Sequence, residues 1–159
     1  MGLRKGGIPL AKAEIVFATI TGNNEDIADI IAENLEDQGL DVQVDEISQA
    51  DVSDFEDADL CIVCPYTYDE GNLPDEGMDF FDDLQETDLS GKIYGVAGSG
   101  DTFYGEYYCT AVDEFSRVLK EAGAIQGAPD VKINLSPDTD EDLDTLDQFT
   151  DQLVAKLEE

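Results

Sequence analysis

Short apolar runs alternate along the chain with longer segments in which apolar residues recur every three or four positions. Runs of the first kind predict buried β-strands, and segments of the second kind predict amphipathic helices. The predicted strands cover residues 13–18, 41–47, 59–65, 92–98 and 131–135. The predicted helices cover residues 26–40, 75–85, 107–123 and 140–157.

The order of these elements predicts the fold class. Apolar strands separated by helices are typical of an α/β fold, in which helical crossovers connect parallel strands and cover both faces of one sheet. In such folds ligands bind beyond the carboxyl ends of the strands, where the strand order reverses. The loops after residues 18, 65 and 98 are the most unusual in composition, and all three fall at that end of the predicted sheet.

Composition narrows the classes of function. The chain has 159 residues, with 39 Asp and Glu against 8 Lys and Arg, no histidine and a formal net charge of -31. This charge excludes a nucleic-acid binder and disfavours an anionic membrane surface, because both partners need basic side chains. The missing histidine excludes Ser-His and Cys-His catalysis. The length fits one domain, expected over residues 13–159 after a flexible tail at residues 1–12.

The cysteines point to a reducing compartment. Their number is odd, with Cys61, Cys64 and Cys109, and the start of the chain lacks the apolar segment of a secretory leader. We therefore expect a cytoplasmic protein. Cys61 and Cys64 lie three residues apart in a predicted buried strand, so they should point to opposite faces as unreactive thiols.

The loop after the first strand is a candidate phosphate site. It reads Thr19-Ile20-Thr21-Gly22-Asn23-Asn24 and leads directly into a helix. Hydroxyl, amide and backbone N–H groups there can converge on an anion, assisted by the helix N-terminus. An ordinary strand-to-helix turn with Thr21 or Asn23 as N-cap is an equally good explanation of this loop alone.

The loops after the third and fourth strands carry aromatic residues beside small ones. The first contains Tyr66, Tyr68 and Gly71, and the second, over residues 98–104, contains Ser99 and Tyr104. Two tyrosines from opposite loops can enclose a planar ring system. A single tyrosine in such a place more commonly covers the edge of the core, but the combination with a phosphate loop favours a flat phosphorylated ligand.

Three motifs together resemble the flavodoxin family over residues 13–159. They are the T-x-T-G-N turn at residues 19–23, the loop YTYDEGNLPDE at residues 66–76, and GSGDTFYGEYYCTAVD from residue 98 to 113. The short segment after the fifth strand resembles the short-chain type. The resemblance implies a flavodoxin-like three-layer sandwich around a five-stranded parallel sheet of order 2-1-3-4-5, with FMN bound without a covalent link.

The resemblance also implies which residues contact FMN. Residues 19–24 would bind its phosphate, Tyr68 and Tyr104 would flank the isoalloxazine ring, and backbone N–H groups of the loop at residues 99–101 would face its pyrimidine end. The complete expected set is Thr19, Ile20, Thr21, Gly22, Asn23, Asn24, Tyr66, Thr67, Tyr68, Asp69, Glu70, Gly71, Asn72, Ser99, Gly100, Asp101, Tyr104, Tyr107 and Cys109. No metal ligand and no catalytic residue is expected.

The function implied by the resemblance is low-potential transfer of single electrons between reductases and acceptor enzymes that present basic patches, by a monomer without substrate turnover of its own. Two alternatives share the scaffold: an FMN-dependent quinone or azo reductase, and a flavin-binding partner in ribonucleotide reductase maturation. The first usually needs extra loops over the flavin, and the second usually differs in the aromatic loops. A phospho-acceptor receiver domain is excluded because Thr19–Asn24 replaces its acidic pair and Val63-Cys64-Pro65 its phosphorylated aspartate.

The sequence departs from the family pattern at three places. Asn24 stands where a threonine is usual, Asp69 follows the inner aromatic residue where many members carry glycine, and residues 105–108 read one residue longer than usual. In the family, the peptide after the inner aromatic residue turns over on reduction of the flavin, which glycine tolerates best. Asp69 is therefore expected to lower the potential at which the first electron is taken up.

Overall fold

The computed structural model describes residues 12–17, 23–47, 50–64, 82–100, 110–134 and 140–157. The strands are β1 (Lys12–Phe17), β2 (Asp41–Glu46), β3 (Leu60–Cys64), β4 (Ile93–Gly100), β5 (Ile125–Gln126) and β6 (Val131–Asn134). The helices are α1 (Asn23–Asp37), α2 (Val52–Glu56), α4 (Thr110–Glu121) and α5 (Asp140–Leu157). Among the described residues, no helix is long and apolar enough to cross a membrane.

All strand pairs described are parallel, and the sheet order is β2-β1-β3-β4-β5 with β6 also paired to β4. The predicted α/β fold and the order 2-1-3-4-5 are confirmed, but the predicted number of five strands is wrong. Two segments share the fifth position: β5 pairs with the start of β4 and β6 with its end. Sequence periodicity did not reveal β5 because its two residues, Ile125 and Gln126, are both exposed.

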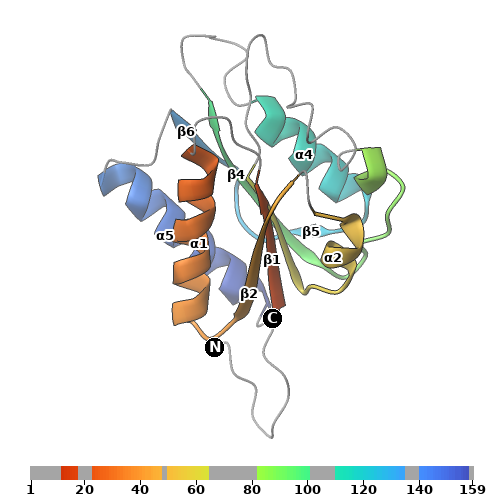
Figure 1. The fold of residues 1–159 in the computed structure, drawn as a ribbon, viewed down its shortest axis with the longest axis horizontal. Coiled ribbons are helices and arrows are strands. Elements are labelled where there is room, and N and C mark those ends of the chain that lie inside the picture. The colour runs from red at the N-terminus through yellow and green to blue at the C-terminus, as the bar shows by residue number, and fades with distance from the viewer. Residues whose placement is uncertain are drawn as a thin grey trace, which may run out of the picture.

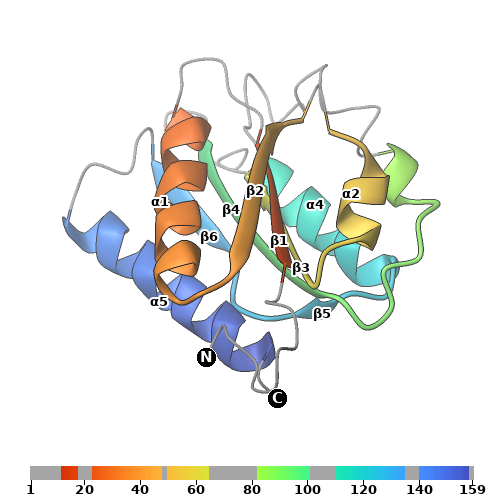
Figure 2. The ribbon, with the colours of Figure 1, turned by 60° about the horizontal axis from the view of Figure 1, so that its bottom comes forward.

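Helices cover both faces of the sheet, as predicted. Figures 1 and 2 show α1 and α5 together on one face and α2 and α4 on the other. The two helices of the first pair also touch through polar side chains, since Asn34 Nδ2 donates to Asp147 Oδ1 at 2.7 Å. The sheet is thus the middle layer of a three-layer sandwich, and each face has its own apolar cluster.

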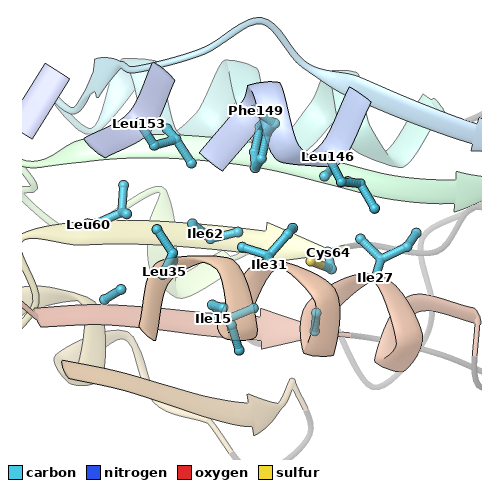
Figure 3. Close-up of a cluster of buried hydrophobic side chains, with 14 of the residues drawn as sticks. Ile15, Ile27, Ile31, Leu35, Leu60, Ile62, Cys64, Leu146, Phe149 and Leu153 are labelled. Carbon is cyan, nitrogen blue, oxygen red and sulfur yellow. The ribbon is translucent and has the colours of Figure 1, made fainter. Parts of the chain in front are cut away.

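The cluster under α1 and α5 explains the positions of those helices. Ile27, Ile31 and Leu35 descend from α1 onto the sheet at spacings of four residues, and Leu146 and Phe149 descend from α5 (Figure 3). This is the stripe that the sequence pattern predicts for each helix. One predicted stripe residue of α5 is different: Leu143 remains 38% exposed, because it lies in the first turn, beyond the apolar cluster.

Helix and strand limits differ modestly from prediction. The last helix has the predicted limits, and β1 begins one residue early, at Lys12. The five-residue α2 was not predicted, although Asp51 and Asp54 form a capping box at its start. Of the predicted helix 75–85, residues 75–81 lie outside the described part of the chain, as do residues 1–11 of the predicted tail.

Candidate functional site

The carboxyl ends of three strands stand level at one end of the sheet. Phe17, the last residue of β1, pairs with Glu46 of β2 and with Cys64 of β3. The chain after β2 is held to β1 as well, because Ile47 N–H donates to the Phe17 carbonyl at 2.7 Å. The last residues of β1 and β3 therefore lie side by side, about 5 Å apart.

Strand β4 continues past this level. Val63 pairs with Val96, so Cys64 stands level with Ala97, and β4 runs on to Gly100. At about 3.3 Å per residue, the last three residues extend roughly 10 Å beyond the ends of β1 and β3. They are supported on their other side by β6, with Ser99 paired to Ile133 and Gly100 to Asn134. The result is a step whose wall is backbone of Gly98, Ser99 and Gly100.

Helix α1 brings its N-terminus to the same end of the sheet. It begins at Asn23, six positions after the last residue of β1. The first N–H groups of a helix have no partner within the helix and, with the helix dipole, favour an anion. Glu25 and Asp26 occupy the first turn. An anion in this place would be bound by backbone N–H and side-chain hydrogen bonds rather than by a charge on that turn.

The structure brings four of the predicted contact residues to this end. Asn23 and Asn24 form the start of α1, and Ser99 and Gly100 are the last residues of β4. The other predicted contact residues lie outside the described part of the chain: Thr19, Ile20, Thr21, Gly22, Tyr66, Thr67, Tyr68, Asp69, Glu70, Gly71, Asn72, Asp101, Tyr104, Tyr107 and Cys109.

The two cysteines of β3 contribute no reactive thiolate to this site. Cys64 packs in the cluster with α1 and Cys61 in the cluster with α4, on the opposite face, and both are free thiols, as predicted. Burial raises the pKa of Cys61 to about 12, and burial also raises the pKa of Cys64. The Cys61 thiol lies 3.6 Å from the Phe55 carbonyl oxygen as a weak donor.

A second polar group, which the sequence pattern did not reveal, lies on the face of the sheet covered by α2. Glu14 of β1 is only 3% exposed, and one carboxylate oxygen each from Glu14, Asp45 and Asp54 lie within 4.8 Å of one another. Burial raises the pKa of Glu14 to about 9, helped by a hydrogen bond with Asp45 and the charges of Asp45 and Asp54. The available signal was a single acid within the otherwise apolar first strand.

A family model, a sequence relative and a solved structure all match this chain to the same family. The family model described as flavodoxin matches residues 15–149. The probable flavodoxin 1 of Bacillus subtilis is 38% identical over 146 residues, which is 92% of each chain. A solved flavodoxin structure from Streptococcus pneumoniae TIGR4 is 56% identical, with a TM-score of 0.88 over 92% of this chain and 99% of that one.

A more distant structure shares the fold alone. The flavodoxin of Fusobacterium nucleatum is 18% identical and has a TM-score of 0.77, over 92% of this chain and 99% of that one. That protein is bound to flavin mononucleotide.

Proposed function

The chain belongs to the flavodoxin family of flavin-binding electron carriers, and from this membership we propose that it transfers single electrons through one non-covalently bound FMN. The resemblance predicted from the sequence is thereby confirmed for the family and for its electron-carrier function. Flavodoxins carry electrons between other enzymes and do not turn over a substrate. No observation on this chain favours a quinone reductase or a partner in ribonucleotide reductase maturation.

The step at the carboxyl ends of β1, β3 and β4 is the observation that supports FMN as the ligand. A flavin mononucleotide combines one phosphate with a flat ring system. The N-terminus of α1 suits the phosphate, because the first N–H groups of a helix have no partner within the helix, and α1 begins six positions after β1. The backbone of Ser99 and Gly100, which extends beyond the end of β3, offers hydrogen-bonding groups to a ring edge.

The remaining contacts are proposed from the sequence motifs. Thr19, Thr21 and Asn23 would donate hydrogen bonds to the phosphate, and Tyr68 and Tyr104 would enclose the ring. Such enclosure excludes water from the ring faces while leaving one edge near the surface, where a partner can approach. When bound, FMN supplies the redox chemistry; the protein binds, orients and shields it.

Charge is the basis for the proposed partners. With 39 acidic and 8 basic residues, the chain attracts proteins that present Lys and Arg, and this raises the rate of encounter at low salt. We propose flavodoxin reductases and acceptor enzymes with basic docking patches. We also propose that the protein acts as a monomer in the cytoplasm, where its buried thiols stay reduced.

Flavin content and electron transfer test this function directly. The purified full-length protein should be yellow, and the flavin released by acid should have the mass of FMN. After removal of flavin, the protein should bind FMN more tightly than riboflavin, because only FMN has a phosphate for residues 19–24. The reduced protein should pass electrons to a basic one-electron acceptor such as cytochrome c, faster at low than at high salt.

A matched pair of variants separates the phosphate loop from general effects. Thr21→Ala should weaken FMN binding and leave riboflavin binding nearly unchanged. Thr145→Ala removes a hydroxyl of the same kind from α5, where it donates to the Glu141 carbonyl at 2.9 Å, and should leave both affinities unchanged. A protein that binds no flavin, or binds FMN and riboflavin equally, would contradict the proposal.

A further inference from the structure

Glu14 is an unusual residue for the centre of a sheet. It stands between Ala13 and Ile15 in β1, with Gln43 of β2 on one side and Cys61 of β3 on the other. The side chain is 3% exposed, and its Oε2 atom is buried without a hydrogen-bond partner. Burial of a carboxyl oxygen without a partner is costly, and such atoms are rare in folded proteins. A bound cation would give this oxygen atom a partner.

Two further carboxylates face the same point. Asp45 is two residues along β2 from Gln43, the residue aligned with Glu14, so both acids are on the same face of the sheet. Asp54 reaches the group from α2, which covers that face. One oxygen atom from each of the three residues lies within 4.8 Å of the others.

Each of the two aspartates is already held in place by a neighbour. Asp45 Oδ2 accepts a hydrogen bond from Gln43 Nε2 at 2.8 Å. Asp54 Oδ2 accepts the Asp51 backbone N–H at 3.2 Å, as part of the capping box of α2. These bonds hold both carboxylates in place and leave each with a second oxygen atom. The three acids therefore form a set of oxygen ligands that is already arranged before an ion binds.

A cavity of about 140 Å³ opens beside this group. Its lining includes Glu14 and Asp54, and the other lining residues are Lys12, Ala13, Asp41, Gln43, Asp57 and Ala58. The charged groups facing it are therefore mostly acidic, with Lys12 as the basic one among them. Within the described residues, the ion pairs formed by Arg117 and Lys132 involve other acids, namely Glu114, Glu121 and Asp113.

We propose that Glu14, Asp45 and Asp54 bind one hard divalent cation of the size of Ca²⁺, at a site separate from the flavin. Oxygen atoms up to 4.8 Å apart match a central ion with bonds of about 2.3–2.6 Å, and the cavity has room for the waters that complete its coordination. The smaller Mg²⁺ requires bonds of about 2.0–2.1 Å and keeps most of its water, so it fits this spacing less well. Zinc is disfavoured because no histidine is present and Cys61 is not in the group.

The bound ion would connect side chains from three elements. It bridges the edge of the sheet, through β1 and β2, to the five-residue helix α2. The expected consequence is a Ca²⁺-dependent increase in thermal stability. The group lies on the face of the sheet opposite α1, whose N-terminus is the proposed phosphate site.

Calorimetric titration of the chelator-treated, FMN-loaded full-length protein with CaCl₂ tests the site. A background of about 0.1 M KCl screens diffuse attraction of cations to the acidic surface. We expect one Ca²⁺ per chain above this background and a rise in melting temperature larger than KCl produces at equal ionic strength. MgCl₂ should bind more weakly than CaCl₂ at the same site.

Three variants separate a specific site from the overall charge. Glu14→Gln and Asp54→Asn should each weaken Ca²⁺ binding by at least about tenfold, because each removes a carboxylate ligand. In the wild type, Ca²⁺ would replace the proton that Glu14 holds in the ion-free protein. Glu33→Gln, on the exposed surface of α1, removes the same charge elsewhere and should leave binding unchanged. Asp54→Asn keeps an oxygen atom that can accept the Asp51 N–H, so this variant should fold. If Glu14→Gln fails to fold, Asp54→Asn alone tests the Ca²⁺ site.

Two results would overturn the proposal. One is a wild-type protein without Ca²⁺ binding beyond the KCl background, which would mean that water or a proton alone satisfies Glu14. The other is equal Ca²⁺ binding in wild type, Glu14→Gln, Asp54→Asn and Glu33→Gln, which would show only diffuse attraction by the net charge.

Discussion

The ring of Phe149 rests directly on Gly95: a β-carbon on that glycine would lie 2.7 Å from Phe149 Cζ and 3.1 Å from each methyl carbon of Leu153. Real β-carbons do not approach a ring this closely, so α5 packs on the sheet at a distance that only glycine permits. Gly95 is the third residue of β4, the strand whose far end forms the wall of the proposed flavin site.

The first prediction concerns this contact. Gly95→Ala should lower the free energy of unfolding by about 1–3 kcal/mol, because the added methyl group forces Phe149 and Leu153 out of their packed positions. Urea unfolding of the flavin-free protein measures the loss. Combining Gly95→Ala with Phe149→Leu should cost less than the sum of the single changes, since the smaller side chain leaves room for the methyl group. Additive losses would show that the ring is not the obstacle.

The second prediction concerns the thiols of β3. In a Cys109→Ser background, Cys61 and Cys64 should not react with a disulfide reagent while the protein is folded. With a pKa of about 12, only about one Cys61 in 10⁴ is a thiolate at pH 8, and both side chains are completely buried. The readout is the rate of thiol modification with and without denaturant. Fast modification of the folded protein would contradict the packing described for β3.

The third prediction concerns pH. The pKa of Glu14 is raised in the folded protein from 4.5 to about 9, so the folded state holds a proton that the unfolded state releases. The contribution of this proton to the free energy of unfolding is therefore complete below about pH 4.5. It is lost progressively as the pH rises to about 9. Compared with Glu14→Gln, the wild type should lose up to about 1.4 kcal/mol per pH unit across this window.

Chelator-treated protein at constant ionic strength is needed for that comparison. Unfolding free energies are measured by denaturant titration at several pH values for the wild type, Glu14→Gln and the exposed control Glu33→Gln. The control should follow the wild type, because it changes the same charge at an exposed position. If Glu14→Gln also follows the wild type, the carboxyl group of Glu14 does not hold its proton in the folded state.

The fourth prediction rests on the sequence alone. Asp69→Gly should raise the potential for uptake of the first electron by about 40 mV, which corresponds to relief of about 1 kcal/mol of backbone strain at a non-glycine residue. Redox titration of both FMN-loaded proteins gives the potentials. Glu70→Gln is a useful control, because it removes a neighbouring charge without changing backbone freedom. An unchanged or lower potential in Asp69→Gly would contradict this role.

Local sequence patterns were sufficient to predict the helices and strands whose apolar residues recur regularly. The stripe through Leu146, Phe149 and Leu153 predicted α5 because three of its turns press one face on the sheet. The continuous apolar run at β3 predicted a strand buried on both faces. Short elements were missed for the opposite reason: β5 has two exposed residues, and α2 places only Phe55 in the core.

The proposed flavin site and the group around Glu14 differ in how well their positions could be predicted from the sequence. The end of the sheet that binds ligands followed from topology, since the carboxyl ends of parallel strands lie together. The extension of β4 to Gly100 was underestimated by two residues, because glycines at positions 98 and 100 weaken the strand pattern although β6 supports them. The group around Glu14 could not be found by periodicity, since it joins residues from three elements that are distant in sequence.

The division of the fifth strand position into β5 and β6 also affects how molecules meet in concentrated solution. An uninterrupted edge strand presents a row of free backbone groups on which another molecule can build a strand, and that is a common beginning of aggregation. Here one edge strand ends at Gln126, and the next residue, Gly127, donates its N–H to the Tyr94 carbonyl at 3.0 Å. The opposite edge, β2, carries Asp41, Asp45 and Glu46 along its length. Within the described residues, each border of the sheet is thus a poor template for growth into a fibril.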